Sequence, residues 1–279
     1  MTTPPPRPSP RADRGRRRRL AGLRALVTGG SSGVGRALAV ELARRGVRVL
    51  ATARRADRLA ELGRAPLPAA AAPIETLAGD VTDAAVRSRL LDRARAAFGG
   101  LDLVVAAAGG GAIGGFRDAS PATLRAIMEL DFFAPAELVR ASLPLLDEGR
   151  DPGIVLVGSI LGRHPLPLHA DYCAAKAALA SLAGTLRAEL APAGIDVLLV
   201  SLGPTRSEFW DHLLAGARPA WSAGRPLPAE TAATAIVDAL ERRSPEATPG
   251  WAARGFALAA RACPWLIDAV VARRRRLTA

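Results

Sequence analysis

The chain has 279 residues, of which 49% are hydrophobic, and a formal net charge of +12 at pH 7. A chain of this length and apolar content can bury a large core, and no interdomain linker is evident between residues 23 and 248, so we expect one domain. Its two cysteines and three histidines are too few and too isolated for a disulfide framework or a metal cluster. We therefore expect no metal and a reducing, cytoplasmic location.

The positive charge is concentrated at the two ends of the chain. Residues 1–20 contain seven arginines and one aspartate, and residues 251–279 contain six arginines and one aspartate. The first segment combines proline and arginine with almost no apolar side chains, which predicts a disordered basic tail over residues 1–20. It has no apolar stretch of the kind found in signal peptides, so secretion is not expected.

Residues 251–279 predict an apolar and basic helical extension. Arg261, Pro264 and Asp268 interrupt its apolar residues, which argues against a membrane span. Helices ending in the arginines 273–276 would either cover this protein's own pocket or a partner subunit, or lie on an anionic membrane surface. Nucleic-acid binding is not expected, because no aromatic platform or recognition-helix motif accompanies the arginines.

Between the ends, short apolar runs alternate with helical stretches. The apolar runs occupy residues 23–27, 47–52, 74–77, 103–107, 154–157 and 197–200. Alternation of this kind is typical of a parallel sheet covered by helices on both faces. We therefore predict an α/β fold, a single Rossmann-type doubly wound parallel sheet, as a dinucleotide-binding catalytic domain over residues 21–250.

Helix boundaries can also be predicted. Thr82 is a candidate N-cap for a helix over residues 83–98, and Ser120 followed by Pro121 predicts the start of a long helix. Pro135 and Pro144 should kink or end that helix.

The first apolar run ends in the sequence TGGSSGVG, residues 28–35. Between a strand and a helix, Gly29, Gly33 and Gly35 would let the backbone turn tightly and approach a pyrophosphate, which the helix N-terminus then holds with its free N–H groups. The motif predicts a dinucleotide site. The alternative is an ordinary strand-to-helix turn, because a glycine-rich turn alone is a weak signal.

Tyr172 is the only tyrosine of the chain, and Lys176, four residues later, is the only lysine. The segment from residue 170 to 187 predicts a helix, so both side chains would lie on one face of it. A nearby cation favours the phenolate, so we expect Lys176 to lower the pKa of Tyr172 toward neutrality, where it can exchange protons. Ser159 supplies a hydroxyl upstream. The alternative is an amphipathic surface tyrosine and a solvated lysine.

Together these motifs resemble the short-chain dehydrogenase/reductase family over residues 23–243. The family's cofactor motif is matched by Thr28, Gly29, Gly33 and Gly35, and its adenine-contacting pair is matched by Asp80 and Val81. Its catalytic serine, tyrosine and lysine are matched by Ser159, Tyr172 and Lys176. Its nicotinamide-contacting segment is matched by Gly203, Pro204 and Thr205.

The resemblance implies hydride transfer between a nicotinamide and the carbonyl or alcohol carbon of a small-molecule substrate. Ser159 would polarise the substrate oxygen, Tyr172 would give or take its proton, and Lys176 would bind the nicotinamide ribose. The family is commonly dimeric or tetrameric, so we expect a homo-oligomer. The expected cofactor contacts are Thr28, Gly29, Ser31, Ser32, Gly33, Val34, Gly35, Arg54, Arg55, Asp80, Val81, Ala107, Gly109, Tyr172, Lys176, Gly203, Pro204 and Thr205.

Two departures from the family pattern stand out. Residues 106–109 read Ala-Ala-Ala-Gly where the family has Asn-Asn-Ala-Gly, and Asp131 aligns with a helix asparagine of the active site. A carboxylate could accept the same hydrogen bonds but would place a charge near Lys176, so we count Asp131 among the catalytic residues. The alternatives are that Asp131 faces elsewhere, and that the protein binds a dinucleotide but has weak catalytic activity.

The second apolar run ends in ATARR. Ala53 stands where an NAD site has an acidic residue, and Arg54 and Arg55 follow it. The missing acid and the two arginines favour NADP(H), with NAD(H) as the alternative, because arginine binds the 2′-phosphate.

Residues 206–228 resemble the family's variable substrate lid and contain Phe209, Trp210 and Trp221, which favours apolar substrates over sugars. The loop over residues 164–169, with a histidine at each end, either lines the same pocket or is a plain connection. Cys173 is expected to be a packed residue, because no histidine is placed to activate it.

Overall fold

The computed structural model describes residues 17–69, 71–218, 225–263 and 265. Within them, the chain forms a 7-stranded sheet of order β3-β2-β1-β4-β5-β6-β7, and every neighbouring pair is parallel. The strands are β1 (Arg24–Thr28), β2 (Arg48–Ala53), β3 (Ile74–Ala78), β4 (Leu103–Ala106), β5 (Gly153–Ser159), β6 (Asp196–Leu202) and β7 (Glu246–Ala247). This is the predicted doubly wound α/β fold.

The helices connect these strands. They are α1 (Gly33–Arg44), α2 (Ala56–Gly63), α3 (Ala84–Phe98), α4 (Pro121–Met128), α5 (Ala134–Asp147), α6 (Ala170–Glu189), α7 (Ala229–Glu241) and α8 (Trp251–Ala262). The shorter turns are the π-helical η1 (Glu129–Phe133) and the 3-10 turns η2 (Ile160–Gly162), η3 (Ala191–Ala193) and η4 (Glu208–His212).

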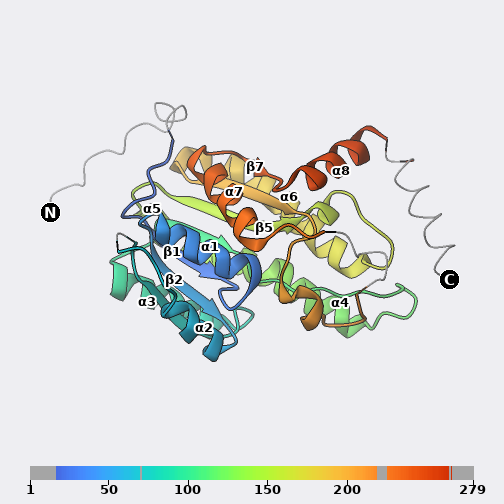
Figure 1. The fold of residues 1–279 in the computed structure, drawn as a ribbon, viewed down its shortest axis with the longest axis horizontal. Helices are drawn as coiled ribbons and strands as arrows, with labels where there is room; N and C mark the ends of the chain where they lie inside the picture. Colours follow the sequence, from blue (N-terminus) through green and yellow to red (C-terminus); the bar gives the residue numbers. More distant parts are fainter. Residues whose placement is uncertain (1–16, 70, 219–224, 264, 266–279) are drawn as a thin grey trace.

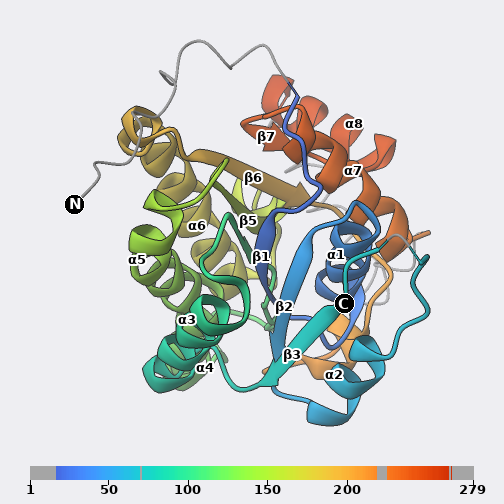
Figure 2. The same ribbon diagram turned by 90° about the vertical axis from the view of Figure 1, so that its left-hand side faces the viewer.

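Helices cover both faces of the sheet (Figures 1 and 2). Figure 2 shows α3, α4, α5 and α6 on one side and α1, α2 and α7 on the other. Each face carries a large apolar cluster, so the central strands are buried on both sides. Burial on both sides explains why β1, β4, β5 and β6 are continuous apolar runs in the sequence.

The strand predictions agree with the structure to within about two residues at each end, as is usual for element boundaries. The exception is β7, which the sequence did not predict. It contains only Glu246 and Ala247, and such a short edge strand has no apolar run to reveal it.

Helix boundaries were predicted less well. Thr82 is not the N-cap of α3: Asp83 is, and its carboxylate accepts a hydrogen bond from the N–H of Ala85 at 2.8 Å. Thr82 instead donates its hydroxyl to Asp80. Aspartate competes well with threonine for N-cap positions, so the neighbouring residue took the cap. Ser120 caps α4 as predicted, accepting from the N–H of Ala122.

Pro135 and Pro144 act differently from each other. Pro144 lies inside α5, which continues to Asp147, so this proline does not end the helix. Pro135 lies in the first turn of α5 and lacks an N–H, so it cannot donate to the carbonyl four residues earlier. Directly before α5 the helix widens into the π turn η1, which contains Asp131.

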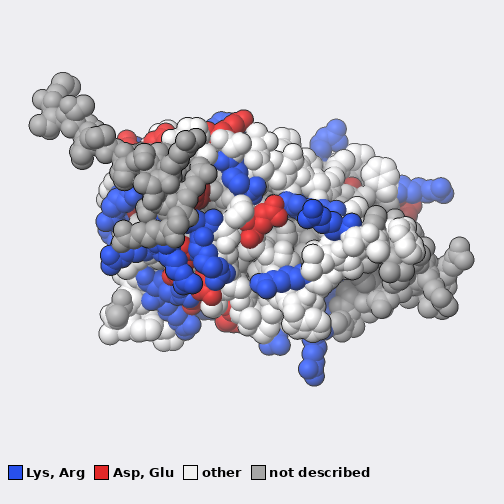
Figure 3. Space-filling model, turned by 90° about the horizontal axis from the view of Figure 1, so that it is seen from above, with Lys and Arg blue, Asp and Glu red and all other residues white. Residues whose placement is uncertain are grey.

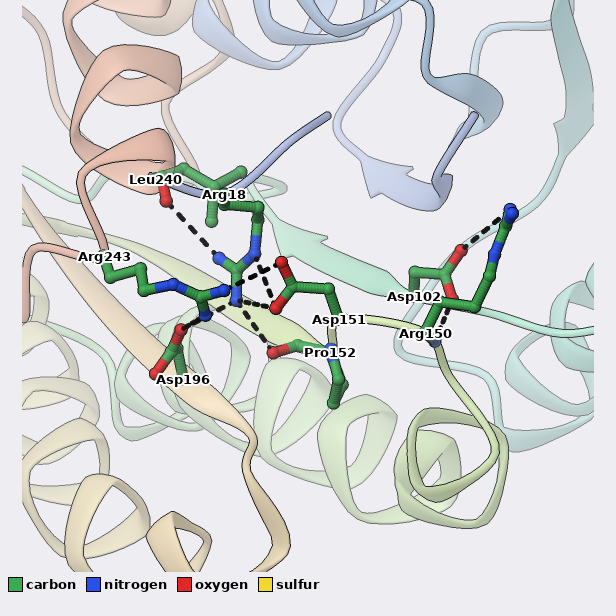
Figure 4. A network of polar contacts seen from close by, with 8 residues as sticks. All are labelled: Arg18, Asp102, Arg150, Asp151, Pro152, Asp196, Leu240 and Arg243. Atoms are coloured by element: carbon green, nitrogen blue, oxygen red, sulfur yellow. Dashed lines mark hydrogen bonds and ion pairs between the residues drawn. The ribbon is translucent and has the colours of Figure 1, made fainter. Parts of the chain in front are cut away.

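The predicted disordered tail over residues 1–20 is wrong at its C-terminal end. The guanidinium of Arg18 is buried and pairs with Asp196 at 2.8 Å and with Asp151 at 3.4 Å (Figure 4). It also donates to the carbonyl of Pro152 at 2.9 Å. Burial lowers the pKa of Arg18, and the two carboxylates oppose that effect. Residues 1–16 lie outside the described part of the chain.

Both partners of Arg18 lie where β5 and β6 begin. Arg243 joins the same network, with contacts of 2.9 Å to Asp151 and 2.6 Å to Asp196. The network therefore ties residue 18 to the amino edge of the sheet, opposite the edge where the strands end.

Charges of both signs lie next to each other on the face shown in Figure 3. No helix in the described residues is long and apolar enough to cross a membrane. The predicted C-terminal extension is helical over α8, and its arginines 273–276 lie outside the described residues.

Candidate active site

The glycine loop lies where β1 ends and α1 begins, at the carboxyl edge of the parallel sheet. Gly29 has a positive φ of 74°, and a β-carbon there would lie 2.8 Å from the carbonyl oxygen of Ala107. A β-carbon at Gly35 would lie only 2.3 Å from the carbonyl oxygen of Gly29. Both positions therefore require glycine, and the turn is tighter than an ordinary strand-to-helix connection.

The N-terminus of α1 is available to a ligand. Ser32 precedes the helix, but its side chain makes no capping hydrogen bond. The first N–H groups of a helix need an acceptor, and an anionic pyrophosphate supplies one. The loop, with Ser31, Val34 and Gly35 beside this uncapped end, fits the dinucleotide that the sequence predicts.

Thr28 supports the site from within instead of facing it. Its hydroxyl accepts hydrogen bonds from the N–H groups of Ala107 and Ala108, each at 3.0 Å, and the residue is 2% exposed. The hydroxyl of Thr28 therefore holds the segment after β4. The predicted contact of Thr28 with the cofactor stays a prediction.

Ser159, Tyr172 and Lys176 come together beside this loop. Ser159 ends β5, and the other two residues lie in the first two turns of α6. The hydroxyl of Ser159 lies near the Tyr172 phenol and lowers its pKa. The ammonium nitrogen of Lys176 lies 5.7 Å from the centroid of the Tyr172 ring. The surface alternative is excluded for Lys176, which is 5% exposed.

Asp131 lies against Lys176. Its Oδ2 atom is 3.4 Å from the ammonium, and its Oδ1 atom accepts a hydrogen bond of 2.9 Å from the N–H of Gly110. The residue is completely buried, so the alternative in which it faces elsewhere is wrong. Lys176 also donates to the carbonyl of Val157 at 3.3 Å. Asp131 thus connects the segment after β4 to the lysine of α6.

The expected lowering of the Tyr172 pKa is not observed. Burial of the phenol raises the pKa of Tyr172 above its usual value, and the negative charge of Asp131 raises it further, while the hydrogen bond with Ser159 opposes both effects. The prediction considered Lys176 and neither the burial of the phenol nor the charge of Asp131. The carboxylate next to the ammonium offsets the field that would otherwise stabilise the phenolate.

Burial also raises the pKa of Asp131, and the attraction of Lys176 opposes the shift. Its Oδ2 atom has no hydrogen-bond partner among the described residues. A β-carbon at Gly109 would lie 3.0 Å from Asp131 Oδ1 and 3.3 Å from Lys176 Nζ, so the backbone of Gly109 borders this pair. Ala107 and Gly109 therefore lie between the glycine loop and the Asp131–Lys176 pair.

Of the two arginines after β2, only Arg55 reaches the glycine loop. It donates to the hydroxyls of Ser32 at 2.7 Å and Ser31 at 3.1 Å. Arg54 is exposed. Ala53, at the position of the missing acid, is buried at the end of β2.

The remaining predicted contacts also follow strand ends. Val81 is buried, and the carboxylate of Asp80 accepts hydrogen bonds from the N–H and hydroxyl of Thr82. Gly203, Pro204 and Thr205 follow β6. The expected cofactor residues after β1, β2, β3, β4 and β6 therefore all lie at the carboxyl edge of one parallel sheet.

The predicted lid reaches over this site. Phe209, in η4, meets the Tyr172 ring edge-on, with centroids 5.9 Å apart, and its neighbour Trp210 lies 5.3 Å from it. A β-carbon at Gly111 would lie 2.3 Å from the Phe209 ring. Residues 219–224 of the predicted lid, including Trp221, lie outside the described part of the chain.

The two histidines of the loop over residues 164–169 lie in different surroundings. His164 packs edge-on against Phe256 of α8, at 6.1 Å between ring centroids. His169 is buried, with its Nδ1 atom 2.9 Å from the carbonyl of Pro167. Burial lowers the pKa of both rings. Cys173 is a buried residue of α6, as expected, and burial raises the pKa of its thiol.

Sequence reasoning missed Glu208. Its carboxylate lies 2.5 Å from Arg55 and belongs to the same short turn as Phe209. The two residues are 153 positions apart, and no local spacing reveals such a contact.

Comparisons with known proteins identify the family of this chain. The sequence model of the short chain dehydrogenase family matches residues 24–217. An uncharacterized oxidoreductase of Myxococcus xanthus is 39% identical over 185 residues, which cover 66% of this chain and 73% of that protein. A hydroxysteroid 11-beta-dehydrogenase 1-like protein of Xenopus tropicalis is 30% identical over 242 residues, which cover 84% of this chain and 81% of that protein.

A solved structure agrees as well. The crystal structure of a short-chain dehydrogenase from Streptomyces avermitilis superimposes with a TM-score of 0.77 at 32% identity, covering 92% of this chain and 99% of that one. The family match spans both the glycine loop and the serine, tyrosine and lysine of the site. The chain therefore belongs to the short-chain dehydrogenase/reductase family and is an oxidoreductase of that family.

Proposed function

We propose that this protein is an NADP(H)-dependent oxidoreductase that acts on the carbonyl or secondary alcohol group of a lipophilic small molecule. The observation that carries the proposal is the meeting of Ser159, Tyr172 and Lys176 beside a glycine loop that fits a dinucleotide. When bound, the nicotinamide supplies or accepts the hydride.

The protein's own residues handle the proton and the substrate oxygen. In the reduction direction, the Tyr172 phenol donates its proton to the carbonyl oxygen, while the Ser159 hydroxyl donates a hydrogen bond to the same oxygen. The raised pKa of Tyr172 favours the protonated phenol, the form that acts as the acid. Lys176 is held by Asp131 and by the carbonyl of Val157, and its remaining donor capacity can serve the ribose.

Arg55 supports the preference for NADP(H). Its guanidinium contacts both serines of the glycine loop, where a 2′-phosphate on the adenosine ribose would find a bidentate partner. The second strand ends in Ala53, which offers no carboxylate to a ribose 2′-hydroxyl. Arg54 remains a candidate for the same role, because it is exposed beside Arg55.

The lid supports a lipophilic substrate. Phe209 packs against Tyr172, so an apolar ring already lies next to the proposed proton donor. The relatives named as hydroxysteroid 11-beta-dehydrogenase 1-like proteins support the same substrate class.

Purified protein mixed with NADPH or NADH and a panel of ketones, aldehydes and quinones tests this proposal. We expect dinucleotide oxidation with apolar ketones, and a higher kcat/KM with NADPH than with NADH. Equal rates with the two dinucleotides would contradict the NADP(H) preference, and turnover restricted to polar sugars would contradict the substrate class.

A second candidate is a dinucleotide-binding protein with weak catalytic activity. The Asp131–Lys176 pair favours it, because this carboxylate opposes formation of the phenolate at Tyr172. Tight binding of NADPH without turnover of any substrate in the panel would support this candidate over the first.

We further propose that the protein forms a homodimer or homotetramer in the cytoplasm and contacts anionic membranes through α8. Trp251 is 88% exposed and Leu258 is 68% exposed on this helix, with Arg254 between them. Exposed aromatic and aliphatic side chains flanked by arginine suit an anionic lipid surface. Co-sedimentation with anionic vesicles, lost on removal of residues 251–279, would support the membrane contact, and sedimentation unaffected by the removal would contradict it.

Analytical ultracentrifugation gives the oligomeric state, and a monomer would contradict the proposed assembly.

A further inference from the structure

The η4 turn, preceded by Ser207, rests on the glycine loop. A β-carbon at Gly33 would lie 2.8 Å from the Cβ atom of Ser207. Two residues later, Phe209 contacts Tyr172. One short segment therefore touches both the loop that fits the pyrophosphate and the residue that handles the proton.

Arg55 joins this segment to the loop. One guanidinium nitrogen, Nη2, donates to the hydroxyls of Ser31 and Ser32. The other, Nη1, donates to Glu208 Oε2 at 2.5 Å and lies 3.1 Å from the Nε2 atom of His212. The face of the guanidinium that could bind a phosphate is therefore already occupied by an anion of the protein itself.

Glu208 is well suited to hold that position. The hydrogen bond from Arg55 keeps the pKa of Glu208 below its usual value, so the group is a carboxylate at neutral pH. Arg58 lies 3.8 Å from its other oxygen. The side chains of Arg55 and Glu208 are 31% and 36% exposed, so a solvent anion can reach and replace the pair.

We propose that Glu208 is a specificity-determining residue of the dinucleotide site, because its carboxylate competes with a 2′-phosphate for Arg55. The proposal rests on the NADP(H) preference proposed above. A phosphate monoester carries roughly 1.5 to 2 negative charges at neutral pH and can displace a single carboxylate, whereas a ribose 2′-hydroxyl carries none. Only the 2′-phosphorylated dinucleotide can therefore displace Glu208 of η4 from Arg55.

The release has a consequence at the other end of the turn. Because Phe209 follows Glu208 directly and packs on Tyr172, displacement of the carboxylate loosens the residue that covers the proton donor. Recognition of the 2′-phosphate and access of substrate to Tyr172 are thus coupled through one turn of the lid.

Calorimetric titration with 2′,5′-ADP and with 5′-AMP tests the competition without any turnover. The variants are Glu208→Gln and the matched control Asp211→Asn, which removes the same charge from the same exposed turn. Among the described residues, Asp211 forms no ion pair with Arg55. An exposed or half-exposed pair is worth up to about 1 kcal/mol, so Glu208→Gln should tighten 2′,5′-ADP binding about fivefold. Binding of 5′-AMP should stay unchanged, and Asp211→Asn should affect neither ligand.

Several results would overturn the competition. They are unchanged or weaker binding of 2′,5′-ADP by Glu208→Gln, equal tightening of both ligands, or the same gain in Asp211→Asn. Arg55→Ala provides a second check, because it should remove the preference for 2′,5′-ADP over 5′-AMP. If neither the wild type nor Glu208→Gln prefers 2′,5′-ADP over 5′-AMP, both the NADP(H) preference and the role of Glu208 are contradicted. Turnover of ketones with NADH in that case would still support the proposed oxidoreductase activity.

Discussion

Replacing Asp131 with asparagine should lower the pKa of Tyr172. The carboxylate lies 3.4 Å from the Lys176 ammonium, and Lys176 lies 5.7 Å from the centre of the Tyr172 ring. In the wild type, the negative charge of Asp131 offsets the positive charge that would stabilise a phenolate. Asparagine keeps an oxygen for the N–H of Gly110 but removes the charge.

The magnitude follows from these distances. At an effective dielectric constant of about 20, an ammonium 5.7 Å from the phenol ring stabilises the phenolate by about 3 kcal/mol, or about 2 pKa units. Asp131 cancels part of this effect, so its removal should lower the pKa of Tyr172 by about one unit. In alcohol oxidation the phenolate is the base, so the rise of kcat/KM with pH should move to lower pH by a similar amount.

The chain offers a direct assay, because Tyr172 is its only tyrosine. The ultraviolet absorbance of the phenolate, followed against pH, reports this residue alone, with circular dichroism to confirm that the protein stays folded. Glu129→Gln is the matched control, since Glu129 is an exposed carboxylate on the same π turn. A pKa of Tyr172 that is unchanged or raised in Asp131→Asn, or lowered equally in Glu129→Gln, would refute the reasoning.

Two further predictions concern the rest of the fold. Arg18→Met removes a buried charge from its ion pairs and should lower the free energy of unfolding by about 3 kcal/mol, with a fall of roughly 10 °C in Tm. Arg19 is exposed, so Arg19→Met should change the free energy of unfolding by less than about 0.5 kcal/mol. Equal Tm values for the two variants would contradict the network. Gly35→Ala places a β-carbon 2.3 Å from the carbonyl oxygen of Gly29 and should weaken NADPH binding by about tenfold or more in calorimetry, because the loop must shift. Gly184 lies in a helix with open space around it, so Gly184→Ala should leave NADPH binding unchanged. Unchanged NADPH affinity in Gly35→Ala would contradict the requirement for glycine at position 35.

The fold could be predicted from sequence because its central strands are buried on both faces. That burial demands uninterrupted apolar residues, which are visible without a structure. The glycine loop and the Tyr172–Lys176 pair could be predicted for a similar reason, since their geometry depends on residues close together in the chain. The edge strand β7 could not, because two residues carry no such pattern.

Contacts between distant residues account for the other failures. Arg18 looks like part of a solvated basic tail, but its carboxylate partners lie 133 and 178 positions away. Burial of the phenol raises the pKa of Tyr172, and Asp131 raises it further. Asp131 reaches the site only because η1 and α6 pack together. Glu208 meets Arg55 in the same way, through the path of the lid.

The central claim is that the Tyr172 phenol exchanges the proton that accompanies hydride transfer. The most direct measurement compares turnover and NADPH binding in the wild type and in Tyr172→Phe, which keeps the ring against Phe209 but lacks the hydroxyl. We predict that NADPH binds with unchanged affinity while kcat falls by about 10²- to 10⁴-fold. A variant that binds NADPH and still reduces ketones at the wild-type rate would contradict the claim.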